Sequence, residues 1–352
     1  MEKADDPAPI PPSGPELAAP GSTEEPAKEI EAPSKFVVEP ASGELITSVT
    51  TKNTYKMGHR IGDGFFGVVY SCTDDWNNDL AAKILKPKNT YEKVKEAAAT
   101  ELEKLFALRH PNITYVYDAF EYRDTFYIVT ERCASSLDKF FDTQWFDGSV
   151  WIMPLARCLL QAVHFIHLNQ MAHQDIHPGN VFATFVRNEM SSIDTEPGIQ
   201  FRLGDLGVAK LFSEIDAKNT RKDGMLPPEA IDPKEFGPCD HRIDLYHCGL
   251  LFLQLAHSRA ISFTIDETVA GKPRELALSL SPPLNFALEK ALRRHAQYRT
   301  ASVLELWRDL NSPGIATQPS EVQQDLNFSP TPKLEEATTD TRQEADEKGS
   351  GE

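Results

Sequence analysis

Polar residues in the second half of the chain stand at a spacing that suits phosphoryl transfer. His173, Asp175 and Asn180 form an H-x-D-x-x-x-x-N segment, and Asp205 follows 25 residues after Asn180 as the first residue of a D-x-G triplet. A carboxylate such as that of Asp175 can orient an acceptor hydroxyl and take its proton. Asn180 and Asp205 offer the hard oxygen atoms that a divalent cation bridging phosphates prefers. Two unrelated polar turns are the alternative interpretation, and the order and spacing of the residues make it the weaker one.

A glycine-rich segment in the first half of the chain can approach phosphate groups closely. Gly62, Gly64 and Gly67 form the pattern G-x-G-x-x-G, with Asp63 between the first two glycines. Because glycine has no Cβ, its backbone N–H groups can surround phosphate oxygens. In a dinucleotide-binding fold this pattern opens a helix, whereas here a β-branched run follows it. Taken alone, the segment is also compatible with a plain hairpin turn.

A lysine lies in an apolar run after these glycines. Lys83 ends the sequence Leu-Ala-Ala-Lys, and a lysine among apolar residues is costly to bury unless an opposite charge pairs with it. Glu101, in the helix predicted next, can supply that charge. Taken singly, the two residues are also compatible with a surface lysine and a solvated acid.

Short strands and one helix must position the first-half residues. Runs of β-branched and aromatic residues predict strands over residues 55–61, 67–72, 80–85, 113–120 and 125–130. Residues 91–108 are rich in Ala and Glu and carry apolar residues at helical spacing, so they predict a helix that ends before Pro111. After Ser135 the pattern is mainly helical, with helices predicted over residues 149–169, 244–257, 283–295 and 300–310.

The order of these segments resembles that of a eukaryotic-type protein kinase domain over residues 53–312. The further matches are a His-Pro-Asn-Ile turn at 110–113, a hinge at 131–133, Pro-Pro-Glu at 227–229, a helix starting at Asp244 and a late arginine, Arg299. The resemblance implies an α+β, bilobal fold. A small antiparallel β-sheet lobe with one key helix would span about residues 53–133, and a larger, mainly helical lobe about residues 134–312.

The resemblance also implies ATP and Mg²⁺ as cofactors and a protein as substrate. Lys83 would hold the α- and β-phosphates and Glu101 would hold Lys83. Asp175 would act as the base or orient the acceptor, and Asn180 and Asp205 would bind Mg²⁺. The other implied nucleotide contacts come from the glycine segment (Gly62, Asp63, Gly64, Gly67), from Val69 and Ala81 above the adenine, from Phe182 below it, and from the backbone near Glu131 and Cys133. Asp244 would support the catalytic loop, and Arg299 would pair with Glu229.

Four departures from the family pattern leave alternatives open. Gln174 replaces the arginine that receives an activation-loop phosphate, and residues 221–226 lack the usual threonine and tyrosine. Leu206 for phenylalanine is a mild change. His177 replaces a lysine that neutralises the transferring phosphate, and neutral histidine supplies less charge near pH 7. A pseudokinase that serves as a nucleotide-binding scaffold is therefore one alternative.

The same loop suggests a second alternative. The run from His177 to Asn180, His-Pro-Gly-Asn, also resembles the loop of aminoglycoside and choline phosphotransferases, which are small-molecule kinases. Those enzymes lack the Pro-Glu motif and the helix beginning at Asp244. Both features are present here, which favours phosphoryl transfer to serine and threonine hydroxyls of proteins.

The net charge of −17 at pH 7 is unevenly spread. Residues 1–52 hold nine of the 25 prolines and a net charge of −6, and residues 313–352 also carry −6. We therefore expect a disordered acidic tail on each side of the domain, although residues 35–47 contain apolar side chains that can dock on the core. So acidic a chain is ill suited to binding nucleic acid or an anionic membrane surface.

The sequence also predicts where the protein resides. We expect no membrane span, because the most apolar run, residues 249–256, is far shorter than the ~20 residues a bilayer requires. The first ten residues do not resemble a signal peptide. Five scattered cysteines indicate free thiols in a reducing compartment. We therefore expect a cytoplasmic protein. The sequence does not indicate its oligomeric state or its protein substrate.

Overall fold

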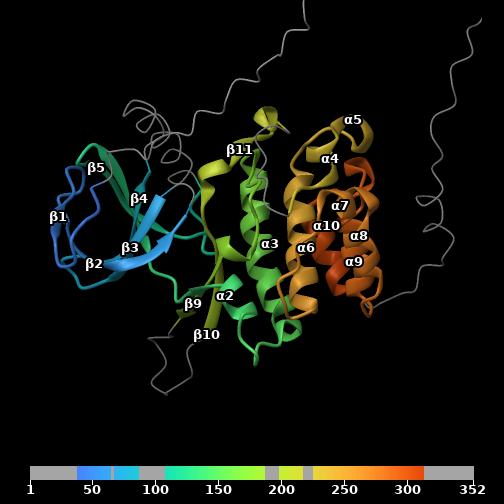
Figure 1. Cartoon of the computed structure of the whole chain (residues 1–352), viewed down its shortest axis with the longest axis horizontal. Coiled ribbons are helices and arrows are strands. Elements are labelled where there is room, and N and C mark those ends of the chain that lie inside the picture. The colour runs from blue at the N-terminus through green and yellow to red at the C-terminus, as the bar shows by residue number, and fades with distance from the viewer. Residues whose placement is uncertain (1–37, 65–66, 87–107, 187–197, 217–224, 313–352) are drawn as a thin grey trace, which may run out of the picture.

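The computed structural model describes residues 38–64, 67–86, 108–186, 198–216 and 225–312 (Figure 1). Within these residues a β-sheet lobe is followed by a mainly helical lobe, which confirms the predicted bilobal α+β fold. In Figure 1 the sheet lies on the left and the helices on the right, with β9 and β10 between them. The predicted helix over residues 91–108 falls almost entirely outside the described residues.

The first lobe contains a six-stranded antiparallel sheet in the order β1-β2-β3-β4-β6-β5. Its strands are β1 (Leu45–Thr47), β2 (Thr54–Asp63), β3 (Gly67–Thr73), β4 (Asp79–Leu85), β5 (Val116–Tyr122) and β6 (Thr125–Glu131). Polar turns join the strands: Asp74 accepts hydrogen bonds from the backbone of Trp76 and Asn78 between β3 and β4. Arg123 and Asp124 both have positive φ, as a two-residue hairpin between β5 and β6 requires.

Strand β1 lies before the predicted domain boundary at residue 53. Ile46 is 1% exposed and packs in the apolar cluster of the sheet, whereas its neighbours Leu45 and Thr47 are exposed, as the two-residue period of a strand dictates. Glu39 also accepts a hydrogen bond from the hydroxyl of Tyr70. The sheet lobe thus includes β1, which lies before residue 53 and within the stretch 35–47 whose apolar side chains were expected to be able to dock on the core. Residues 1–37 and 313–352 of the predicted tails lie outside the described part of the chain.

The second lobe is built from helices of very different lengths. They are α2 (Asp138–Phe141), α3 (Ile152–Leu168), α4 (Pro228–Ile231), α5 (Pro233–Phe236), α6 (Arg242–Ala256), α7 (Ile265–Ala270), α8 (Lys272–Leu278), α9 (Leu284–Ala291) and α10 (Val303–Asn311). Each of the four predicted helices corresponds to one of the longer elements α3, α6, α9 and α10. The remaining helices have four to seven residues, too few to show a 3.6-residue period in the sequence.

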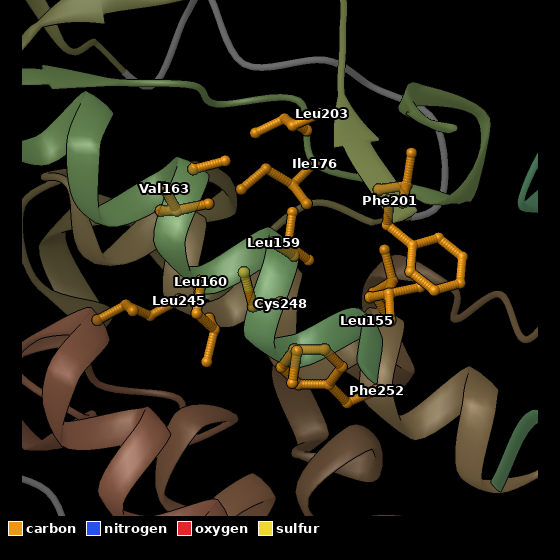
Figure 2. Packing of buried hydrophobic residues seen from close by; sticks show 14 of the residues in the cluster. Leu155, Leu159, Leu160, Val163, Ile176, Phe201, Leu203, Leu245, Cys248 and Phe252 are labelled. Carbon is orange, nitrogen blue, oxygen red and sulfur yellow. The ribbon is translucent and has the colours of Figure 1, made fainter. Parts of the chain in front are cut away.

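Helices α3 and α6 form the centre of this lobe. Figure 2 shows Leu155, Leu159 and Val163 of α3 near Cys248 and Phe252 of α6, within one buried apolar cluster. All residues of α6 from Ile243 to Leu255 are buried. A helix enclosed on every side is expected to be apolar on every side. The polar residues within α6 therefore need specific partners.

One stretch of this lobe, Gly148–Leu168, is long and apolar enough to cross a membrane by length and composition alone. It comprises a 3₁₀ turn (Gly148–Trp151) and α3, and it is longer than residues 249–256, the run predicted to be the most apolar. Leu155, Leu160 and Ile166 of this stretch are buried against the rest of the lobe, as in the core helix of a folded domain.

Two small sheets hold the loops that carry the predicted catalytic residues. They are formed by β7 (Ser135–Ser136), β9 (Val181–Val186) and β10 (Gly198–Leu203), and by β8 (Met171–Ala172) and β11 (Lys210–Leu211). Residues 173–180 connect β8 to β9, and residues 204–209 connect β10 to β11. Because β9 pairs with β10 and β8 pairs with β11, both ends of one loop lie beside the ends of the other. The topology thus joins two segments that are distant in sequence.

Candidate active site

Asp244 of α6 fixes the start of the loop 173–180. Its carboxylate is fully buried and accepts hydrogen bonds from the backbone N–H groups of His173, at 2.8 Å, and Gln174, at 2.7 Å. His167 lies at 2.9 Å from the same carboxylate. These contacts stabilise a left-handed backbone conformation at Gln174, where φ is 64°. The support that the resemblance implied for this loop is therefore present in the structure.

The charge of Asp244 follows from the same contacts. Burial by itself raises the pKa of a carboxyl group, but hydrogen bonds from His167 and from the backbone of Gln174 outweigh it and lower the pKa of Asp244. The carboxylate is therefore ionised at neutral pH and remains a strong acceptor for the two backbone donors.

Asp175 and Asn180 lie against each other at the other end of this loop. The Asn180 side chain donates through Nδ2 to the Asp175 carbonyl at 2.9 Å and to its carboxylate at 3.1 Å. Both residues are buried, at 5% and 7% exposure. Since Nδ2 is turned toward Asp175, Oδ1 is the atom of Asn180 that can serve as a hard ligand. The orientation of Asp175 is thus fixed by its neighbour.

His177 also lies beside Asp175. Its Nδ1 accepts a hydrogen bond from the backbone of Gly179 at 3.1 Å, which requires Nδ1 to be unprotonated and places the proton of the neutral ring on Nε2. Nε2 is 3.7 Å from Oδ2 of Asp175. The ring therefore directs Nε2 toward the carboxylate of Asp175.

Lys83 and Asp205 bridge the two lobes. Nζ of Lys83, on β4, is 3.0 Å from Oδ1 of Asp205, which lies between β10 and β11. Asp205 has a left-handed backbone conformation, with φ at 57°, and its carboxylate also accepts a hydrogen bond from the backbone of Gly207. Glu101 lies outside the described residues, so the predicted pair of Lys83 and Glu101 stays a prediction.

The glycine segment forms the connection between β2 and β3. The backbone of Gly64 donates a hydrogen bond to the carbonyl of Gly67 at 2.9 Å, and Gly62 pairs with Val69 across the two strands. A Cβ at Gly67 would lie 2.5 Å from the carbonyl oxygen of Ile84, so only glycine fits this position. The carboxylate of Asp63 pairs with Arg60 and Lys86, which keeps it on the surface of the sheet.

The residues predicted to enclose an adenine ring come from three strands. Val69 of β3 stands opposite Lys83, and Ala81 of β4 stands opposite Thr130 near the end of β6. Phe182 of β9 packs so closely on Gly204 that a Cβ there would lie 2.7 Å from its ring. Strand register therefore places Val69 and Ala81 beside the lysine, and Phe182 beside the residue that precedes Asp205.

Glu131, at the hinge, has a role for its side chain that the sequence did not indicate. It accepts a hydrogen bond from the backbone of Tyr115 at 2.7 Å, and its other oxygen lies 2.9 Å from Nε of Arg202 on β10. The side chain thus ties the hinge to the second lobe.

Burial raises the pKa of the nearby Cys133 thiol to about 12, so this thiol is protonated and unreactive at neutral pH.

The predicted pair of Glu229 and Arg299 is present and completely buried. The guanidinium donates from both terminal nitrogens, at 2.6 and 2.7 Å, and lies over the ring of Tyr246. Removing one partner of such a pair leaves a buried charge without compensation. The pair therefore holds the segment that begins α4 against the body of the lobe.

The position of two further polar residues of α6, His247 and Gln254, close to Asp175 was not predicted from the sequence. They line a cavity together with Asp175, between the loop 173–180 and α2. Both are 4% exposed. The sequence feature that could have pointed to them is that they are polar residues in an otherwise apolar helix, where a polar side chain needs a specific partner.

Comparison with known proteins adds an independent observation. Residues 55–297 match the family model of the protein kinase domain. A calcium/calmodulin-dependent protein kinase of Metarhizium anisopliae is 30% identical over 212 residues, which cover 58% of this chain and 51% of that protein. Serine/threonine-protein kinase ULK3 of Mus musculus is 25% identical over 244 residues, 67% of this chain and 49% of that protein. Serine/threonine-protein kinase TAO3 of Mus musculus is 26% identical over 212 residues, 59% of this chain and 22% of that protein. The chain thus spans about half the length of these relatives or less.

Proposed function

Because the chain belongs to the protein kinase family, we propose that it transfers a phosphoryl group from ATP, with Mg²⁺, to serine and threonine hydroxyls of other proteins. The choice of serine and threonine follows the names of the relatives ULK3 and TAO3. The free state of all five cysteines supports a cytoplasmic location for this reaction.

One geometric observation carries the proposal. Two loops distant in sequence and one strand of the other lobe bring Asp175, Asn180, Asp205 and Lys83 to the junction of the lobes. This set combines a carboxylate for the acceptor, two oxygen ligands and a cation. Phosphoryl transfer by positioning and charge stabilisation requires these groups.

The side chains present suit a divalent cation and a nucleotide. The carboxylate of Asp205 and Oδ1 of Asn180 are hard oxygen ligands, so these two residues would hold Mg²⁺. The bound ion would supply the positive charge that phosphate oxygens need. Lys83 would contact the nucleotide phosphates as a second cation, and the glycine segment 62–67 would offer backbone N–H groups.

Asp175 would act on the acceptor. Its carboxylate is oriented by Asn180 and lies 3.7 Å from Nε2 of His177, and it would accept the proton of a hydroxyl. His177 supplies less positive charge here than a lysine would. This difference is the specific reason to test a pseudokinase as the alternative.

The acceptor class can be determined directly. The full chain is incubated with γ-labelled ATP, Mg²⁺ and generic acceptor proteins, and in parallel with choline and an aminoglycoside. We expect label in protein, recovered after acid hydrolysis as phosphoserine and phosphothreonine, and no transfer when EDTA removes Mg²⁺. Label recovered only in a small alcohol would establish a small-molecule kinase instead. Absence of transfer together with intact MgATP binding would establish a pseudokinase.

A further inference from the structure

The segment that follows Asp205 is attached to the second lobe over a short stretch. Strand β11 pairs with β8 through two residue pairs. Phe212 comes next, at the start of a 3₁₀ turn (Phe212–Glu214), and its backbone N–H donates a hydrogen bond to the carbonyl of Gln170 at 2.8 Å. So short a ladder stabilises a segment little by itself. Side-chain contacts must therefore contribute to holding this segment.

The ring of Phe212 lies in a cluster with His167 of α3 and His241, the residue before α6. It stacks on His241, with ring centroids 4.8 Å apart and 27° between the planes, and it meets His167 edge-on, at 5.6 Å and 77°. The two imidazole rings are also nearly perpendicular, at 5.2 Å and 85°. Stacked and edge-to-face arrangements are the favoured geometries of aromatic pairs. We call these three residues the ring cluster.

His167 connects the ring cluster to the loop 173–180. Its Nε2 lies 2.9 Å from the buried carboxylate of Asp244, which accepts hydrogen bonds, so Nε2 carries the proton and donates. The same carboxylate accepts the backbone N–H groups of His173 and Gln174, which begin the loop that carries Asp175. The placement of the His167 ring thus bears on the acceptor that holds this loop.

His241 is fixed by a different contact. Its Nε2 lies 3.3 Å from the carbonyl oxygen of Ala301, two residues after Arg299. A carbonyl oxygen can only accept a hydrogen bond, so Nε2 of this ring also carries the proton. Phe212 therefore rests on two rings that are each held by a polar contact, one at Asp244 and one at Ala301.

Gln174 gives this packing a specific importance. It stands where the family pattern has the arginine that receives a phosphate on the segment after Asp205, and its amide has no charge for such a pair. The ring cluster reaches the same place by packing, because Phe212 contacts His167, which binds Asp244, and Asp244 binds the backbone of Gln174 itself. This connection requires no modification of the chain.

We propose that Phe212 is a positioning residue of the active site. It holds the segment after Asp205 and, through His167 and Asp244, the loop 173–180, without a phosphate on that segment. The inference rests on the proposed function, since it concerns the regulation of that same site. It names the contact that takes the place of a phosphate.

Steady-state kinetics of the full chain after phosphatase treatment can test this role. In Phe212→Ala we expect kcat for transfer to protein to fall about tenfold or more while Kd for MgATP stays within about threefold, because Lys83 and the glycine segment 62–67 lie on other elements. Phe212→Tyr keeps the ring and should retain most of kcat, whereas Phe212→Leu keeps apolar volume without a ring and should lose most of it. Leu211→Ala, a change at the exposed neighbouring residue, is the matched control and should keep the wild-type kcat.

The partner ring supplies a second variant. His241→Ala removes the surface on which Phe212 stacks and should lower kcat in the same way. The double variant Phe212→Ala with His241→Ala should be little worse than either single variant, because both changes remove the same contact. If Phe212→Ala does not fold, Phe212→Leu and His241→Ala carry the test.

Hydrogen exchange measures the positioning without any need for activity. The backbone N–H groups of Phe212, His173 and Gln174 should exchange about tenfold faster in Phe212→Ala than in the wild type or in Leu211→Ala, because their hydrogen bonds to Gln170 and Asp244 open more often. Amides of α9 should exchange at the wild-type rate, which separates local loosening from loss of the fold.

Three results would overturn the inference: wild-type kcat in Phe212→Ala or Phe212→Leu, losses that multiply in the double variant, or unchanged exchange at His173 and Gln174 in folded Phe212→Ala. Absence of transfer by every form of the chain, including the wild type, would overturn the proposed function instead. The exchange measurements would then still decide whether Phe212 positions the loop, so the two failures can be distinguished.

Discussion

Lys83 and Asp205 meet at 3.0 Å across the junction of the two lobes, and Asp175 meets Asn180 a short way along the neighbouring loop. Nucleotide binding and acceptor activation are each expected to depend on one or two side-chain atoms. Asp205 is expected to act on the nucleotide through its metal, whereas Asp175 is expected to act only on the acceptor. Single substitutions should therefore separate nucleotide binding from chemistry.

Asp205→Ala should weaken the binding of MgATP, because it removes a carboxylate ligand of the metal. A ligand that binds only the folded protein at a hundredfold excess over Kd adds about 2.7 kcal/mol to its stability. The rise in melting temperature with MgATP should accordingly be smaller in Asp205→Ala than in the wild type. Asp266→Ala, an exposed change on α7, should keep the full rise. An unchanged rise in Asp205→Ala would show that this carboxylate does not hold the metal.

Gln174 should make activity independent of phosphate on the segment after Asp205. Its side chain is an uncharged amide and the residue is 2% exposed, so it cannot form the charge-assisted pair that an arginine would make with a phosphate. Protein treated with phosphatase, and the double variant Ser213→Ala with Thr220→Ala, should keep activity within about tenfold, equivalent to about 1.4 kcal/mol of activation free energy. Loss of nearly all activity with an intact fold would mean that another cation receives a phosphate.

The first strand shows how an element outside the predicted domain contributes to stability. Ile46 of β1 is buried in the sheet lobe, whereas Leu45 of the same strand is 66% exposed. Ile46→Ala should lower the free energy of unfolding by about 2–5 kcal/mol, the usual cost of removing a large buried side chain. Leu45→Ala is the matched control and should change it by less than about 0.5 kcal/mol. Chemical denaturation of both variants would measure the difference, and equal values would contradict the packing of β1.

Elements with strong local patterns could be predicted from the sequence. The alternating runs of β2, β3 and β4 and the periodic helices α3 and α6 were recognisable, as were the types and spacing of Asp175, Asn180 and Asp205. Strand β1 was missed because it has only three residues and lies in a proline-rich, acidic region. Glu131 binding to Arg202, and His247 lying near Asp175, depend on how distant elements cross. No local pattern encodes such contacts.

Buried histidines couple the stability of the whole molecule to pH. Burial lowers the pKa of three histidines, His110, His247 and His257. Around His247, Asp244, Asp175 and Glu229 oppose this shift and His173 adds to it. Between the lowered pKa and the ordinary value of about 6.5, the unfolded chain binds more protons than the folded chain. The stabilisation is therefore complete above about pH 6.5 and is lost as the pH falls below it.

Urea unfolding at pH 7.5, 6.5 and 5.5 should accordingly give a free energy of unfolding that decreases toward pH 5.5. A folded His247→Leu variant should show a shallower decrease, because it removes one of the three histidines that must lose a proton on folding. A free energy that stays constant or increases as the pH falls from 7.5 to 5.5 would contradict the burial of neutral histidines.

The most direct test of a working phosphoryl-transfer site is the comparison of wild type with Asp175→Asn in two quantities, kcat for transfer to protein and Kd for MgATP. Asp175 contacts Asn180 and His177 and is expected to act on the acceptor, not on the nucleotide. We expect kcat to fall to background while Kd stays nearly the same as in the wild type. Wild-type kcat in Asp175→Asn would contradict the assignment of Asp175 and with it the proposed reaction.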